Sequence, residues 1–359
     1  RLRGSQRQVE DIGQQAEKRL EEHLLRPLEK ISVVKRFMIA WILLVVLLIG
    51  AVVYQNLGLS SYYQVLKNVP GGIYQEGVLG RFTNANPIYA ATDADATVSR
   101  LIFAGLLKIN SDGRPTPDLA SGYTVSDNGM TYTVKLKPHL TWQDGQPLTS
   151  RDVLFTYQTI QNPDAQSPLF NAWQGITVSA PDTHTIVFNL PNPLADFPYY
   201  LTNGIVPRHS LSKIPPEDLR SAAFNTVDPV GAGPFAWGGV QVISGSNPNE
   251  EQEQIALTPF AGYSGGQPKL DKFIVDVFAD DNQLNSAFAS GQLTAMLATV
   301  PPPKNIQDGA GVVVHNLLLR AANMVFFKTS SGILADTKVR AALVEGTDTK
   351  SIIDSLGYT

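Results

Sequence analysis

One uncharged stretch divides this chain of 359 residues into two unequal parts. From Phe37 to Tyr54, eighteen consecutive residues carry no charge, and most of them are Leu, Ile or Val. As an α-helix the stretch would be about 27 Å long, close to the thickness of the hydrocarbon core of a membrane. Trp41 and Tyr54 lie near its two ends, where aromatic side chains favour the membrane–water interface. The pattern predicts a transmembrane helix.

The charges beside this stretch predict its orientation. Lys30, Lys35 and Arg36 precede it, and the next basic residue is Lys67. Because basic residues near a span stay in the cytoplasm, we expect residues 1–36 inside and the chain after about residue 57 outside. Two alternatives are open. Uniform hydrophobicity disfavours a buried core helix, and the long basic region without a small-x-small site disfavours a cleaved signal peptide. We favour an uncleaved anchor over residues 37–57, single-pass in the cell membrane.

The residues before the anchor predict an amphipathic cytoplasmic helix. Charges separate apolar residues that recur at three- and four-residue steps; these are Val9, Ile12, Ala16, Leu20, Leu24, Leu28 and Ile31. Such a helix can lie on the anionic inner leaflet of the lipid bilayer, pair with itself, or bind a signalling partner.

Composition excludes several functions. The chain has no Cys, which excludes disulfides, thiolate metal sites, Cys nucleophiles and a lipid-modified Cys. Its net charge of −4 combines +3 in residues 1–36 with −7 in the remainder, so no basic domain suggests nucleic acid as a partner. The length allows two domains or one large bilobed domain. Because the sequence starts without Met and stops inside a helical pattern, we expect a fragment of a longer protein.

The clearest local structure is a strand, a turn and a helix over residues 131–160. Polar and apolar side chains alternate over residues 131–136, which is typical of a strand with one buried face. Asp144-Gly145 favours a tight turn. Thr149 or Ser150 can then cap a helix that has Asp152 in its first turn. Apolar residues follow at helical spacing, at Val153, Leu154, Tyr157 and Ile160.

Several short motifs follow one another along the chain. They include Gly105-Leu106-Leu107, Pro117–Ala120, Trp-x-Asp-Gly-x-Pro-Leu-Thr at 142–149, Ile205–His209, Asp228–Phe235, Tyr263–Asp271 and Asp336–Leu343. Their order resembles that of the family 5 extracellular solute-binding proteins, the oligopeptide- and dipeptide-binding components of ABC importers. The resemblance covers roughly residues 76–350. The chain departs from the family at Gln143, where the family usually has His, at Ala232, which replaces Thr, and at Glu345–Asp348.

The resemblance implies an α/β, bilobed, periplasmic-binding-protein-like (type II) fold with an incomplete lobe II. Residues 58–75 would form a flexible stalk, residues 76–300 lobe I with its family-specific subdomain, and residues 301–359 the start of lobe II. We expect a first hinge strand at Ala295–Val300, a strand at Asn323–Phe327 and a helix from Asp336.

The resemblance also implies a ligand site between the lobes, with peptide delivery to a membrane permease and no cofactor or metal. In the family, the loop that matches the Asn-rich segment at residues 84–87 of this chain lines the cleft between the lobes. The Gly-rich turn that matches Asp228–Phe235 lies close to the same cleft. We therefore expect ligand contacts from Asn84, Ala85, Asn86, Gly233, Phe235 and Asn323. Nickel, glutathione or an oligosaccharide are alternative ligands, and sensing through the N-terminal helix is an alternative role.

An enzyme is not expected. The five His residues show no metal-ligand spacing, and neither a Gly-x-Ser-x-Gly nor a His-Glu-x-x-His motif is present. Gly231 and Gly233 are spaced like part of a phosphate loop, but no Gly-Lys-Ser/Thr follows. His209 is expected to make a structural polar contact.

Overall fold

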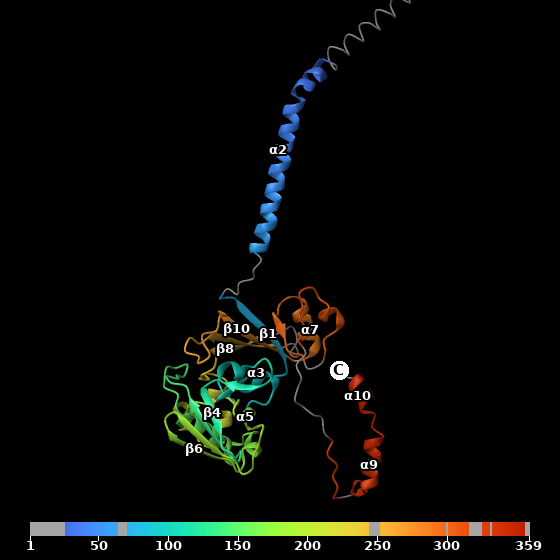
Figure 1. The fold of residues 1–359 in the computed structure, drawn as a ribbon. Coiled ribbons are helices and arrows are strands. Elements are labelled where there is room, and N and C mark those ends of the chain that lie inside the picture. Colours follow the sequence, from blue (N-terminus) through green and yellow to red (C-terminus); the bar gives the residue numbers. More distant parts are fainter. Residues whose placement is uncertain are drawn as a thin grey trace, which may run out of the picture. The chain divides into compact units, whose positions relative to one another are not determined.

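The computed structural model describes residues 26–63, 70–243, 252–298, 301–315, 325–330 and 332–355 (Figure 1). They fall into two units, Arg1–Val69 and Pro70–Thr359. In the first unit, α2 (Arg26–Tyr63) is one helix of 38 residues. Its Phe37–Gln55 segment is long and apolar enough to cross a membrane, and none of it is buried. The predicted amphipathic helix lies largely outside the described residues.

The predicted flexible stalk is wrong at both of its ends. Residues 58–63 continue α2, and β1 (Ile73–Leu79) already begins within the expected stalk. Helical hydrogen bonding propagates from the long apolar segment, and one glycine at position 58 is not enough to stop it. Residues 64–69 lie outside the described part of the chain.

The second unit is built on a five-stranded mixed sheet. β1 lies between two parallel neighbours, β10 (Lys272–Phe278) and β11 (Ala295–Met296). β10 pairs antiparallel with β9 (Gln252–Pro259), which pairs antiparallel with β8 (Phe235–Ile243). The order across the sheet is β11-β1-β10-β9-β8. We name it the main sheet.

Two helices cover parts of this sheet (Figure 1). α3 (Asp93–Ile102) packs against β1, β8 and β10, where the main hydrophobic core lies. α7 (Asp281–Ala289) packs against β1, β10 and β11 through a second apolar cluster that contains Leu284 and Leu293. A Cβ added to Gly77 of β1 would lie 2.5 Å from a methyl carbon of each of these leucines, so an alanine at this position would require both side chains to shift.

A four-stranded antiparallel sheet forms the adjoining subdomain, in the order β4 (Ala120–Val125), β5 (Thr131–Leu136), β7 (Thr185–Asn189) and β6 (Thr177–Asp182). α4 (Ser150–Ile160) packs on β6 and β7. Between them Tyr157 stacks on Trp173 with ring centroids 4.1 Å apart. β2 (Leu107–Ile109) and β3 (Pro115–Pro117) form a separate hairpin. The strand at 131–136 and the helix after Thr149 are confirmed.

Short helices connect these layers. They are α5 (Phe197–Tyr200), α6 (Arg208–Leu211), α8 (Lys304–Gln307), and the 3-10 turns η2 (Pro163–Ala165), η3 (Phe170–Trp173), η4 (Pro216–Ser221), η5 (Ala223–Asn225) and η7 (Gly332–Ala335).

The segment after residue 300 contributes little to the core. α9 (Thr337–Glu345) matches the predicted helix and is followed by α10 (Thr349–Ser355). Of the predicted strand at 323–327, the described residues Val325–Phe327 are irregular, and Val325 and Phe326 are exposed. A strand needs a partner, and none of the described strands pairs with them. After Ile306, no described residue is buried. The division into two lobes at residue 300 stays a prediction.

Candidate functional site

The carboxyl ends of the parallel strands define the candidate site. β1 and β10 are in register up to Leu79 and Phe278, and the amide of Gly80 donates to the carbonyl of Phe278 at 2.9 Å. Open α/β sheets bind ligands outside the carboxyl ends of their strands. The chain from residue 80 to residue 92, which connects β1 to α3, begins at this edge. We name it the β1–α3 loop.

Three predicted ligand residues belong to this loop, and all three are buried. The Asn84 side chain accepts from the amide of Asn86 at 2.8 Å. The Asn86 side chain donates to Oδ1 of Asn225 at 3.0 Å and accepts from the amide of Ile88 at 3.0 Å. The amide of Ala85 donates to the carbonyl of Asn225 at 2.8 Å. These polar groups therefore build the loop from within. Exposed residues beside them include Arg81, Thr83, Ala91 and Asp93.

The carboxylate of Asp95 holds the loop in place, and the sequence reasoning missed it. Asp95 lies in the first turn of α3 and is fully buried. Its Oδ1 accepts from the amides of Thr83 at 2.7 Å and Asn84 at 3.0 Å, and its Oδ2 accepts from the Thr83 hydroxyl at 2.8 Å. Thr92 and Asp95 also form a capping box. The Thr-x-x-Asp spacing was the sequence signal that could have identified it.

Gly233 and Phe235 lie elsewhere. The amide of Gly233 donates to the carbonyl of Ile102, the last residue of α3, at 2.7 Å. Phe235 is buried, and its ring meets the Phe273 ring edge-on with centroids 5.4 Å apart. Phe235 starts β8 and Phe273 is near the start of β10, at the sheet edge opposite the carboxyl end of β1. The structure does not bring them together with the β1–α3 loop. Asn323 lies outside the described residues.

Gln143 connects three separate segments. Its Nε2 donates to the carbonyls of Phe235 at 2.8 Å and Ile102 at 3.1 Å, with a longer contact to that of Gly233 at 3.4 Å. Its Oε1 accepts from the amide of Gly231 at 2.8 Å. The residue that replaces the family's usual His therefore makes a polar contact of its own, which fixes the Gly231–Phe235 turn against the end of α3.

His209 makes the structural contact that was expected. Its Nε2 lies 2.7 Å from Oδ2 of Asp144, in the turn that precedes α4, and its ring meets that of Trp142 edge-on. Among the residues that the structure describes, no group of three or more His, Cys, Asp or Glu could hold a metal ion.

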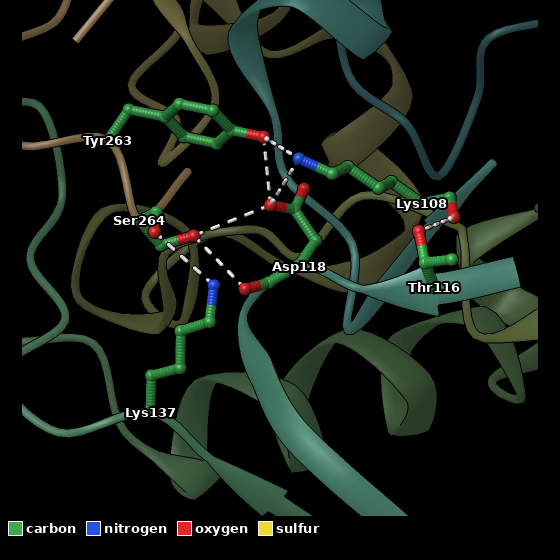
Figure 2. A network of polar contacts seen from close by, with 6 residues as sticks. All are labelled: Lys108, Thr116, Asp118, Lys137, Tyr263 and Ser264. Atoms are coloured by element: carbon green, nitrogen blue, oxygen red, sulfur yellow. Dashed lines mark hydrogen bonds and ion pairs between the residues drawn. The ribbon is translucent and has the colours of Figure 1, made fainter. Parts of the chain in front are cut away.

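A second buried carboxylate, Asp118, connects the small hairpin to the loop after β9 (Figure 2). It accepts from the hydroxyl of Tyr263 at 2.8 Å and lies 3.8 Å from Nζ of Lys108. Ser264 donates to the carbonyl of Asp118 at 3.1 Å and accepts, through its own carbonyl, from Lys137 at 3.2 Å. Burial and the neighbouring carboxylate raise the pKa of Tyr263, so its phenol keeps its proton and donates. This network supports the fold away from the β1–α3 loop.

Comparison with known proteins identifies the class. The model of the family described as "Bacterial extracellular solute-binding proteins, family 5 Middle" matches residues 114–359. The chain belongs to this family. It is 31% identical over 241 residues to a Brucella ovis protein whose name describes a peptide-binding component of an ABC transporter. The aligned region covers 67% of this chain and 44% of that protein.

Two solved structures define the fold. The oligopeptide-binding protein AppA of Bacillus subtilis, solved with a nonapeptide, superposes with a TM-score of 0.65 over 80% of this chain and 56% of AppA, at 24% identity. The ABC transporter substrate-binding protein CtaP of Listeria monocytogenes gives a TM-score of 0.53 over 62% of this chain and 44% of CtaP, at 31% identity. The fold is that of type II periplasmic binding proteins. The chain spans about half the length of the curated relatives it matches.

Proposed function

We propose that this protein is the substrate-binding subunit of an ABC importer, which captures peptides outside the cell and delivers them to a membrane permease. Family membership over residues 114–359 carries the proposal. Relatives named for peptide binding and for oligopeptide binding support peptides as the ligand class. The ligand would lie between two lobes that close by hinge motion, with backbone hydrogen bonds and hydrated pockets tolerating varied side chains.

On this proposal the ligand contacts the exposed side of the β1–α3 loop. Arg81 and Thr83 are exposed beside the carboxyl end of β1, and Asp93 is exposed at the start of α3. The buried side of the loop is already fixed by hydrogen bonds, so little ordering entropy remains to be lost on binding. Asn84, Ala85 and Asn86 would then shape the site from beneath, while their neighbours touch the ligand.

The same proposal makes α2 a membrane anchor. Its Phe37–Gln55 segment has the length and composition of a span, and the preceding basic residues predict a cytoplasmic N-terminus. A transmembrane anchor would keep the binding domain at high local concentration beside the permease. The binding domain would then be extracellular.

Native mass spectrometry of the protein, as its host produces it, tests the ligand class. The purified protein is examined for a co-purifying ligand and is then titrated with a pool of short peptides up to nonapeptide length. Parallel titrations use glutathione, a nickel–histidine complex and an oligosaccharide. Retention of peptides alone supports the proposal. Binding of one of the other solutes, without any peptide, would refute peptide capture and assign that solute.

A further inference from the structure

The β1–α3 loop depends on one buried side chain for its position. Both oxygens of Asp95 face donors: the amides of Thr83 and Asn84 at Oδ1, and the Thr83 hydroxyl at Oδ2. The amides of Ala91 and Thr92 make longer contacts with Oδ2, at 3.4 Å each. One carboxylate therefore holds the loop near both of its ends.

The donors that surround Asp95 suit a carboxylate. A carboxylate only accepts, and each of its neighbours here is an N–H or O–H donor. None of the ion pairs between described residues includes Asp95, so its charge is balanced by these dipoles and by the N-terminus of α3. Hydrogen bonds to a charged acceptor are stronger than neutral ones, and they bring the two ends of the loop together.

A second aspartate provides a matched comparison. Asp152 is buried and forms the same kind of capping box with Thr149 at the start of α4. Its Oδ2 accepts from the amide of Thr149 at 2.9 Å, and its Oδ1 accepts from the amide of Arg208 at 3.1 Å. Asp152 thus caps a helix and fixes a distant amide in α6, outside the β1–α3 loop.

We propose that Asp95 is a positioning residue for ligand binding: it presets the β1–α3 loop so that the exposed side of the loop meets the ligand without reordering. This inference rests on the proposed function, because it assumes that the loop is part of the binding site. It assigns to Asp95 an effect on affinity that Asp152, with the same helix-capping role, does not have.

The test compares Asp95→Ala with Asp152→Ala in the full chain. Each variant loses a capping box and its long-range amide contacts, so both are expected to lose stability. Amide hydrogen exchange, which needs no ligand, should rise about tenfold or more at Thr83 and Asn84 in Asp95→Ala and stay at the wild-type rate there in Asp152→Ala. The amide of Arg208 should show the reverse.

Affinity is measured on the same proteins with the nonapeptide that binds the wild type most tightly. Asp95→Ala should bind about tenfold or more weakly, and Asp152→Ala within about twofold of the wild type. The affinity of Asp95→Asn should fall between those of Asp95→Ala and the wild type, because its remaining oxygen can keep the hydrogen bonds from the amides of Thr83 and Asn84. Asp95→Asn also serves as the test variant if Asp95→Ala does not fold.

Wild-type affinity in the Asp95 variants, or an equal loss in Asp152→Ala, would overturn the inference. If the wild type binds no peptide, the proposed function fails instead, and the exchange rates at Thr83 and Asn84 alone decide whether Asp95 positions the loop.

Discussion

Replacement of Gln143 by Leu keeps the volume of the side chain and removes every hydrogen bond that it makes. The amide of Gly231 loses its acceptor at 2.8 Å, and the carbonyls of Phe235 and Ile102 lose donors at 2.8 and 3.1 Å. Each of these contacts is partly buried, so water can replace only some of them. An unsatisfied buried polar group costs about 1–3 kcal/mol, and partial solvation lowers that cost. We expect Gln143→Leu to lose about 2–4 kcal/mol of unfolding free energy.

Urea unfolding followed by tryptophan fluorescence measures this difference. Gln146→Leu is the matched control, because it makes the same chemical change at an exposed residue of the same turn. The control should stay within about 0.5 kcal/mol of the wild type. Gln143→His, which restores the family's usual residue, should recover part of the loss, since an imidazole offers one donor and one acceptor. Equal unfolding free energies of Gln143→Leu and Gln146→Leu would refute the inference that the Gln143 side chain stabilises the fold by holding the Gly231–Phe235 turn against the end of α3.

Three other predictions concern separate parts of the chain. Gly231→Ala should cost more than about 3 kcal/mol in the same unfolding assay, because its Cβ would lie 1.9 Å from the carbonyl oxygen of Ile102; a cost below about 1 kcal/mol would contradict this. Burial raises the pKa of Glu76, with Arg100 opposing, so the ionised folded state is disfavoured. Glu76→Gln should therefore stabilise the fold at pH 7. This advantage should fade as the pH falls through the raised pKa of Glu76 and be gone below the ordinary glutamate value of 4.5; an advantage that grows in acid would contradict this. Removal of residues 1–57 should move the protein from the membrane to the soluble fraction on cell fractionation, and retention in the membrane would exclude α2 as the anchor.

Several elements could be predicted because their signals are local. The alternation over 131–136 matches β5, and the capping pattern at Thr149 matches the start of α4 at Ser150. Asp144-Gly145 forms the expected turn, with Gly145 at a φ of 83°. Each of these signals lies within a few residues of the structure it determines. The strand expected at Asn323–Phe327 from the family resemblance is not formed in its described part, because a strand needs a pairing partner and none of the described strands pairs with Val325–Phe327.

The sequence by itself determined the apolar span, the strand and helix periods, and membership of a solute-binding family. Only the tertiary structure decided which side of the β1–α3 loop faces solvent. Nothing in the sequence shows that the polar groups of that loop already have partners, yet Asn86 is hydrogen-bonded to Asn225, 139 residues away, and Thr83 is hydrogen-bonded to Asp95. Exposure depends on which distant segments pack together, because a polar group is available to a ligand only when the fold has not already satisfied it.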